Sequence, residues 1–402
     1  MTTTIPAGLP VSDLDPYEID VLTSPWQLHA ALRDAGPVVY LRRYGVYAMA
    51  RYEQVHAALS DWQGFESGAG VGLSNFRHET PWRPPSLLIE ADPPRHDAPR
   101  NVLARILGPR RLHKLREEWF AAAETLVEEV LSDTDEFDAV QRLGAAFPLR
   151  VFPDAVGLPD QGREHLLPYG DFAFNAFGPR NELVERGMGV TTEHAPWVNA
   201  NCARDRLSDG GFGAQVWAAA DHCDLTQEQA PLVVRSLLTA GVDTTVNGIG
   251  ALLYAFATNP EQWRRVQRDP ALVRNAFDEA VRWQSPVQTF FRTATADVEI
   301  GGTVIPKDHK ILMFLGAANR DPRRWTDPDR FDVTRNPSGH VGFGMGIHQC
   351  VGQHVARLEA EALFSALTAR VDSFELTGPA VIRPNNTMRA WQSLPMRIRP
   401  IG

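Results

Sequence analysis

Cysteine is scarce in this chain of 402 residues, and its three cysteines, Cys202, Cys223 and Cys350, lie far apart. So few cysteines cannot build a disulfide framework, and such a count is typical of proteins in a reducing compartment. We therefore expect a cytoplasmic protein.

Long apolar runs are missing as well. The most apolar long stretch, residues 237–256, is interrupted by Asp243, by threonines and by Asn247. It indicates a buried helix and not a membrane span. The first residues have neither a basic region nor an apolar core, which argues against a signal peptide or membrane anchor. Positive charge is not in excess either, since 40 Lys and Arg oppose 49 Asp and Glu. Nucleic acid is therefore not expected as the main partner.

What the chain does have is helical periodicity. Apolar residues recur at spacings of three and four, which predicts helices over residues 25–35, 52–60, 112–131, 227–258, 271–283 and 353–370. Strand-like material is confined to residues 38–46, 293–300 and 311–315. We predict a mainly α fold with small sheets at its edges. Length alone favours two or three domains.

The predicted helix over residues 227–258 has a polar centre. Thr226 and Gln229 form a capping box at its start, and the centre contains Asp243 and Thr244. A buried aspartate is costly to desolvate, so polar residues at the centre of a buried helix require a structural or functional explanation. One explanation is a helix kink with threonine hydroxyls bonded to carbonyls. The other is an acid–alcohol pair that lines a reaction chamber.

Cys350 lies in a glycine-rich segment, residues 343–352, directly before a predicted helix. The helix N-terminus favours the thiolate form. A structural cysteine, a zinc ligand, a nucleophile paired with His348 and an axial ligand to haem iron are the four alternatives. Zinc needs more ligands than the segment offers, and His348 is poorly placed as a base. Haem ligation needs one cysteine with space beside it and a long helix across the other face.

Four motifs resemble those of the cytochrome P-450 (haem-thiolate monooxygenase) family, in the family's order. Residues 343–352 match the haem-ligand signature F-x-x-G-x-H-x-C-x-G, and residues 240–245 resemble the oxygen-binding motif. Glu279 and Arg282 resemble the E-x-x-R motif, and Arg330 resembles the third member of its network, with Arg335 as the alternative. The resemblance implies one triangular domain over residues 1–402, with a long central helix over the haem. It also implies a small β-rich subdomain, mainly within 38–50 and 293–315.

The resemblance implies a site built around haem b. Cys350 corresponds to the axial thiolate ligand of the iron, and Asp243 and Thr244 correspond to the acid–alcohol pair that delivers protons during oxygen activation. Glu279 and Arg282 then belong to the fold and not to the chemistry. The candidates for contacts with the haem propionates are His96, Arg100, Arg292 and His348.

Three further segments, residues 81–87, 174–179 and 285–292, resemble the bacterial group that oxidises para-substituted benzoates such as 4-methoxybenzoate. Ser236, Ala240 and Thr244 are spaced by four and share a helical face, so Ser236 can hold the far end of a one-ring substrate. Arg83 and Ser86 are the further candidate donors to a carboxylate. The candidate apolar walls are Ile89, Phe174, Phe177, Val287 and Phe290.

The sequence thus predicts a monooxygenase that inserts one oxygen atom of O₂ into a small aromatic carboxylic acid, by O-demethylation or hydroxylation. The alternatives are a monooxygenase for another small hydrophobic substrate (a phenol, terpene or fatty acid), a peroxide-driven enzyme and a non-catalytic haem-binding protein. Asp243 and Thr244 argue against the last two.

Electrons must come from outside, because the haem fold leaves no room for a flavin or nicotinamide domain. We expect a [2Fe-2S] ferredoxin with an NAD(P)H-dependent reductase, docking on the face that carries Cys350. Residues 95–116 hold seven basic side chains against Asp97, which suits an acidic carrier. They are Arg95, Arg100, Arg105, Arg110, Arg111, Lys114 and Arg116.

Overall fold

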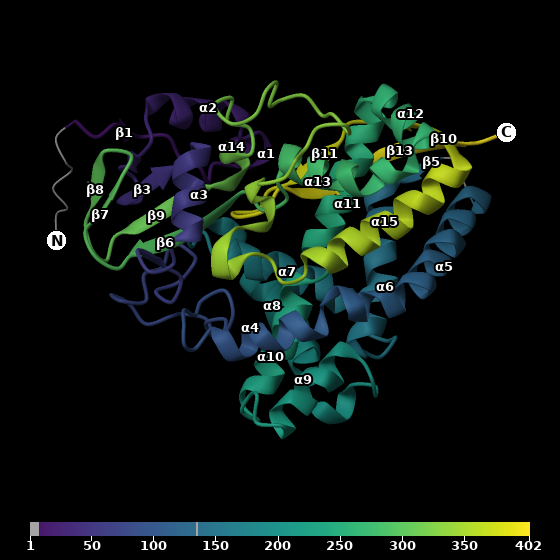
Figure 1. Cartoon of the computed structure of the whole chain (residues 1–402), viewed down its shortest axis with the longest axis horizontal. Helices are drawn as coiled ribbons and strands as arrows, with labels where there is room; N and C mark the ends of the chain where they lie inside the picture. Colours follow the sequence, from purple (N-terminus) through teal and green to yellow (C-terminus); the bar gives the residue numbers. More distant parts are fainter. Residues whose placement is uncertain (1–7, 134–135) are drawn as a thin grey trace.

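The computed structural model describes residues 8–133 and 136–402, and most of them are helical, as predicted (Figure 1). The helices are α1 (Ile19–Thr23), α2 (Trp26–Ala35), α3 (Tyr52–Ser60), α4 (Asp97–Ile106), α5 (Pro109–Asp133), α6 (Ala146–Val156), α7 (Leu166–Asn175), α8 (Glu182–Ala200), α9 (Phe212–Asp221), α10 (Gln229–Ala240), α11 (Asp243–Thr258), α12 (Pro260–Arg268), α13 (Val273–Gln284), α14 (Leu315–Ala318) and α15 (Gln353–Arg370). The six helical segments predicted from periodicity all fall on these helices.

The main sheet lies toward the N-terminal end of the molecule (Figure 1). Its strand order is β1-β2-β3-β9-β6-β4. The strands are β1 (Val11–Ser12), β2 (Val39–Leu41), β3 (Val46–Met49), β4 (Phe65–Glu66), β6 (Thr289–Ala294) and β9 (Lys310–Phe314). Every residue of β3 and β9 is buried, because these strands lie at the centre of the sheet. Side chains alternate along β6, so Phe290 and Arg292 share the face opposite to that of Phe291.

Three smaller sheets complete the fold. They pair β10 (Val371–Leu376) with β13 (Pro395–Pro400) and β5 (Glu136–Asp138), β11 (Val381–Arg383) with β12 (Ala390–Ser393), and β7 (Val298–Ile300) with β8 (Thr303–Ile305). The strands after residue 370 were not predicted. They are short, and their apolar residues alternate with arginines and polar residues over only a few positions.

The helical half packs around aromatic side chains. Phe256 of α11 lies between Trp263 and Phe364, with ring centroids 4.9 and 5.7 Å away. The long helices α5 and α15 lie side by side along this core (Figure 1). These contacts fix α11 and α15 relative to each other, and the candidate site lies between their N-terminal ends.

The central helix starts as predicted but is not continuous. The capping box is present, because the Thr226 N–H donates to Gln229 Oε1 at 2.9 Å and the Gln229 N–H donates to Thr226 Oγ1 at 3.3 Å. The helix breaks between α10 and α11, and the Thr244 hydroxyl donates to the freed Ala240 carbonyl at 2.7 Å. At the break, a Cβ on Gly241 would lie 2.4 Å from the Phe152 ring, so only glycine fits. The predicted helix is therefore kinked, which agrees with the first of the two explanations of its polar centre.

The buried network formed by Glu279, Arg282 and a second arginine includes the side chain of Arg335 and not that of Arg330. Arg282 donates two hydrogen bonds to the Glu279 carboxylate, at 2.7 and 2.8 Å, and Arg335 Nε donates a third at 3.0 Å. Arg330 contributes its backbone carbonyl, which accepts from both arginines. The network ties α13 to the loop that precedes the Cys350 segment, which agrees with a structural role.

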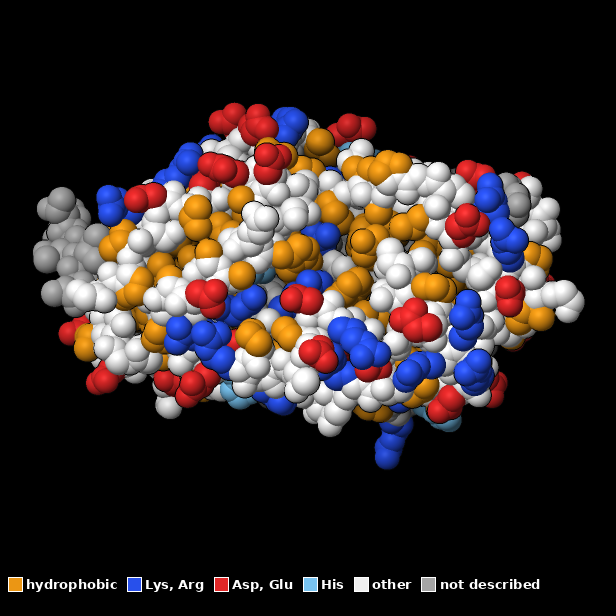
Figure 2. All heavy atoms as spheres, turned by 90° about the horizontal axis from the view of Figure 1, so that it is seen from above, with side chains coloured by type: hydrophobic (Ala, Val, Ile, Leu, Met, Phe, Trp, Pro, Cys, Tyr) orange, Lys and Arg blue, Asp and Glu red, His pale blue; other side chains and the backbone are white. Residues whose placement is uncertain are grey.

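The surface carries no large single-sign patch on the face shown in Figure 2, where acidic and basic side chains are interspersed with apolar ones. Within residues 8–133 and 136–402, no helix combines the length and the apolar character needed to cross a membrane.

Candidate functional site

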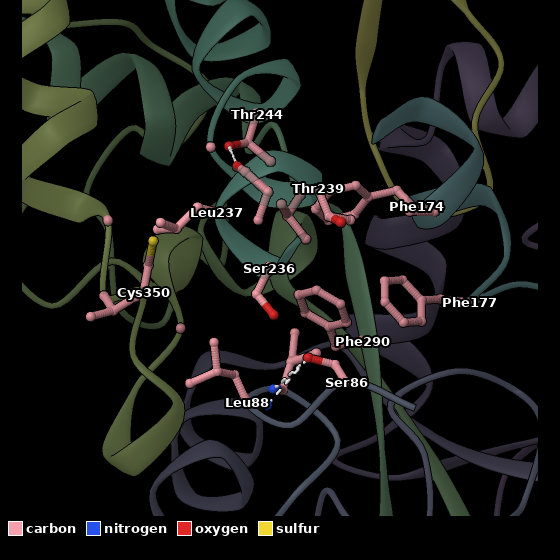
Figure 3. A pocket seen from close by; sticks show the side chains of 18 of the residues that line it. Ser86, Leu88, Phe174, Phe177, Ser236, Leu237, Thr239, Thr244, Phe290 and Cys350 are labelled. Carbon is pink, nitrogen blue, oxygen red and sulfur yellow. Dashed lines mark hydrogen bonds between the residues drawn. The ribbon is translucent and has the colours of Figure 1, made fainter. Parts of the chain in front are cut away.

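A cavity of about 630 Å³ opens between the α10–α11 break, the Cys350 segment, the loop over residues 82–89 and the end of α7. All nine residues predicted to contact the substrate line it: Arg83, Ser86, Ile89, Phe174, Phe177, Ser236, Ala240, Val287 and Phe290. Cys350 lies on one side and the phenylalanines on the other, with Ser236 between them (Figure 3). The volume is in the range usual for small-molecule sites.

Cys350 is held at the start of α15. Its N–H donates to the Phe343 carbonyl at 2.8 Å, and the helix begins three residues later. Burial raises the pKa of the Cys350 thiol, whereas the N–H groups of Gly352 and Gln353 and the Arg100 guanidinium oppose that rise. The predicted effect of the helix N-terminus is therefore present but smaller than the effect of burial. A bound metal cation would hold the sulfur as thiolate.

The segment before Cys350 depends on backbone conformations that favour glycine. Gly346 has φ +65°, and a Cβ there would lie 2.7 Å from the Leu59 carbonyl oxygen. This close approach packs the segment against the end of α3. It leaves the cysteine side chain facing the cavity.

The four predicted propionate contacts gather along one wall of the cavity. His96 and His348 pack edge to face, 4.7 Å between ring centroids, and burial lowers the pKa of His348 to about 4. Arg292 is 3% exposed and donates to the Phe291 carbonyl at 2.8 Å. Within the described chain, no carboxylate lies within 4.0 Å of Arg292. Burial lowers the pKa of its guanidinium to about 10. A buried guanidinium without an anionic partner is costly, so this wall is suited to bind an anion.

Asp243 and Thr244 differ in position. Thr244 lines the cavity, whereas Asp243 is 3% exposed and lies behind it. The Asn247 amide donates to Asp243 Oδ1 at 3.2 Å, and Asp243 Oδ2 has no hydrogen-bond partner. Burial raises the pKa of Asp243 to about 7, and Asp171 adds to this rise while Arg383 opposes it. The carboxyl group can therefore exchange protons near neutral pH.

The far side of the cavity is aromatic. Phe177 contacts Phe174 and Phe290 edge to face, with centroids 5.9 and 5.7 Å apart. These rings come from α7, from the loop after it and from β6. Together they form an apolar wall that can contact an aromatic ring by its faces and edges.

Arg83 does not provide the free cation that the sequence predicted. Its guanidinium makes a bidentate pair with buried Glu90, at 2.7 and 2.6 Å, and stacks on the Phe177 ring. The Ser86 hydroxyl is also engaged, because it accepts from two backbone N–H groups of its own turn. The Ser236 hydroxyl donates to the Leu232 carbonyl at 3.0 Å, which leaves its lone pairs free to accept.

Sequence reasoning missed Arg235, the neighbour of Ser236 in α10. It lines the same cavity, and in the described parts of the chain no acceptor lies within hydrogen-bonding distance of its guanidinium. A single arginine within the apolar run 231–240 was the signal that could have revealed it. Arg235 and not Arg83 is the cation available to an anionic ligand.

Comparison with known proteins decides the family. Residues 214–400 match the family model described as Cytochrome P450. The chain is 52% identical over 394 residues to Cytochrome p450 CYP199A2 of Rhodopseudomonas palustris, and the match covers 98% of this chain and 96% of that protein. The chain is a cytochrome P450. It is also 31% identical to Cytochrome P450-terp of Pseudomonas sp, over 77% of this chain and 76% of that one.

The fold agrees with this assignment. The structure of cytochrome P450 CYP109Q5 from Chondromyces apiculatus superposes with a TM-score of 0.81 at 30% identity, covering 97% of this P450 and 99% of that chain. The predicted family, mainly helical fold, monooxygenase activity and haem b cofactor are therefore confirmed. Cytochromes P450 use O₂ together with a redox partner that supplies electrons.

Proposed function

We propose that this P450 oxidises small aromatic carboxylic acids, with para-substituted benzoates such as 4-methoxybenzoate as the preferred class. The cavity carries this proposal, because its aromatic wall holds a ring and the unpaired Arg235 offers an anion site. Oxidation of a methoxy carbon gives a hemiacetal, which decomposes to a phenol and formaldehyde. Hydroxylation is the outcome when the para group is an alkyl group.

The residues around the cavity fit haem b. Cys350 would bind the iron, and Arg292, Arg100, His96 and His348 would contact the propionates, because all four line the cavity and, within the described residues, no carboxylate lies within 4.0 Å of the buried Arg292. When bound, the haem iron activates O₂ so that one oxygen atom enters the substrate. We infer that the whole chain forms one haem-binding domain.

The remaining roles belong to side chains of the chain itself. The Thr244 hydroxyl, held by the Ala240 carbonyl, is placed to pass a proton into the cavity. Asp243 supplies that proton from behind, because its pKa of about 7 lets it bind and release protons at neutral pH. The phenylalanine wall excludes water and orients the ring, so that the para substituent points toward Cys350 and the carboxylate toward Arg235.

For the electron donor, an acidic [2Fe-2S] ferredoxin remains our proposal, with a cytoplasmic setting. The structure reduces the number of basic side chains that are available to bind the ferredoxin. Arg100 faces the cavity, Arg116 pairs with Glu361 and Arg105 pairs with Asp224. The exposed basic side chains that remain without an ion-pair partner in the described chain are Arg95, Arg110, Arg111 and Lys114.

The test of the substrate class compares a benzoate with its methyl ester. Ferric holoenzyme is titrated with 4-methoxybenzoate and with the ester, and binding is followed by the change of spin state in the Soret band. A charged hydrogen bond lost from a buried site costs about 2 kcal/mol or more, so the ester should bind at least about tenfold more weakly. Arg235→Gln should abolish this difference.

The matched control is Arg186→Gln, which removes an exposed arginine of α8 that pairs with Glu182. It should leave the preference for the acid unchanged. Equal affinity of the wild type for acid and ester, or a larger spin change with a terpene or fatty acid, would contradict the proposed substrate class.

A further inference from the structure

The loop over residues 82–90 holds a carboxylate directly behind the wall of the cavity. The side chain of Glu90 is 0% exposed, compared with 17% for that of Arg83. Arg83 lines the cavity, whereas Glu90 lies behind it. The guanidinium of Arg83 therefore separates the enclosed carboxylate from the space for the substrate.

Glu90 is held in one orientation by four hydrogen bonds. Its Oε1 accepts from Arg83 Nη2 at 2.6 Å and from the Val71 N–H at 3.4 Å. Its Oε2 accepts from Arg83 Nη1 at 2.7 Å and from the Ser86 N–H at 2.9 Å. Both oxygens thus face the guanidinium in the side-by-side geometry that is strongest for an arginine and a carboxylate. The backbone of two different segments keeps the carboxylate in this place.

Arg83 would be a cation at the cavity surface if Glu90 did not neutralise it. The centre of its guanidinium lies 4.7 Å from the centroid of the Phe177 ring, which belongs to the aromatic wall. As a pair, Arg83 and Glu90 have no net charge, so they attract an anion in the cavity far less than a free arginine does. The charge of this part of the wall is therefore decided by Glu90.

The two arginines on the substrate side of the cavity are in opposite states. Arg83 is paired, whereas Arg235 of α10 has no carboxylate within 4.0 Å in the described parts of the chain. Ser86, in the turn that Glu90 holds, and Ser236, next to Arg235, both belong to the wall of this one cavity (Figure 3). A substrate in the cavity is thus close to both arginines, but only one of them offers a net charge.

We propose that Glu90 is a positioning residue that determines substrate specificity through Arg83. By neutralising Arg83, it leaves Arg235 as the unpaired cation on the substrate side of the cavity, within the described chain. An anionic substrate then has one place for its carboxylate, and the rest of the ring is directed away from that place. This inference rests on the proposed function, because it assumes that Arg235 binds the carboxylate of the substrate.

Removal of the charge on Glu90 should create a second anion site. Glu90→Gln keeps the shape of the side chain and leaves Arg83 as a free cation. Ferric holoenzyme of each variant is titrated with 4-methoxybenzoate and with its methyl ester, and the spin-state change of the Soret band is followed. The preference for the acid over the ester should rise about tenfold above that of the wild type, as expected for one added charged hydrogen bond.

The double variant Arg235→Gln/Glu90→Gln gives a sharper test. Arg235→Gln alone should lose the preference for the acid, and the added Glu90→Gln should restore it, because the freed Arg83 then binds the carboxylate. A regained preference cannot come from a damaged structure. In each variant, the Soret band of the reduced carbon monoxide complex reports whether the haem site is intact.

Two controls separate charge from structure. Arg83→Gln/Glu90→Gln replaces the pair by two neutral amides and should keep the preference of the wild type, because the pair has no net charge. Glu129→Gln frees Arg150 from an ion pair between α5 and α6, away from the cavity, and should also keep it.

An unchanged preference in Glu90→Gln would overturn the proposal. Loss of the preference in Arg83→Gln/Glu90→Gln would overturn it as well, since it would mean that Arg83 already binds the carboxylate in the wild type. The proposed function fails separately, if the wild type binds acid and ester equally. A preference for the acid that then appears in Glu90→Gln would still support the role of Glu90.

Discussion

Replacement of Asp243 by asparagine should change how the stability of the protein depends on pH. Burial raises the pKa of Asp243 from 3.8 to about 7. Since the folded-state pKa is the higher one, ionisation above pH 4 stabilises the unfolded chain more than the folded one. The loss of stability therefore grows as pH rises, and it is complete above pH 7. Asparagine does not ionise and escapes this loss.

The size of the effect follows from the shift. One pKa unit corresponds to about 1.4 kcal/mol, so the full loss is about 4 kcal/mol, and somewhat more than half of it falls between pH 5 and pH 8. The unfolding entropy of a chain of 402 residues is about 0.8 kcal/mol/K. Relative to wild type, the melting temperature of Asp243→Asn should thus rise by about 3 °C between pH 5 and pH 8.

The assay is scanning calorimetry of the holoenzyme at a fixed scan rate, for wild type and variant at each pH. Only the difference between the two proteins is used, so that the titration of other groups cancels. Asp160→Asn serves as the control, because it removes an exposed carboxyl and should follow the wild type at every pH. Parallel melting curves for Asp243→Asn and wild type would refute the reasoning, since they would mean that Asp243 is already ionised at pH 5.

Three further outcomes are expected. Cys350→Ser should abolish the red-shifted Soret band of the reduced carbon monoxide complex, and an unchanged spectrum would exclude thiolate ligation by this residue. Thr244→Ala should release hydrogen peroxide at the expense of product, measured as product formed per NADH consumed, and wild-type coupling would remove the hydroxyl from proton delivery. Reduction by an acidic ferredoxin should slow as salt rises and slow further in Arg110→Glu or Lys114→Glu, because steering between exposed charges is screened beyond about 8 Å at physiological ionic strength. Reduction that is independent of salt would place the docking surface elsewhere.

Where periodicity predicted a helix it was correct, because the burial of such a helix is one-sided, but it missed α4, α6, α7, α8, α9 and α12. In α3 and α15, for example, the predicted and observed bounds coincide, because the periodic pattern of apolar residues stops at the residues where each helix ends. The C-terminal strands gave no such signal. In β13, Met396 and Ile398 are buried while Arg397 and Arg399 flank them, a pattern too short to distinguish from a loop.

The break in the central helix shows what local sequence cannot supply. Gly241 and Thr244 indicated a weak point, and the two explanations of the polar centre turn out to be compatible. The position of the break is fixed by tertiary packing, because the Phe152 ring occupies the space that a side chain at position 241 would need. That ring comes from α6, far away in the sequence.

The motifs identified which residues surround the cavity but not which of their charges are free. Arg83 was expected to bind the carboxylate of a substrate. Its guanidinium is instead paired with Glu90 of the same loop, with 2.6 Å between Arg83 Nη2 and Glu90 Oε1. Arg235 had no motif to mark it, and its helix keeps every carboxylate of the described chain beyond 4.0 Å. A cation that lines a cavity recognises an anion only if the protein has not already paired that cation. Charge pairing, which is a property of the folded loop, therefore decides where we propose the anion site, whereas the sequence pattern indicates only its surroundings.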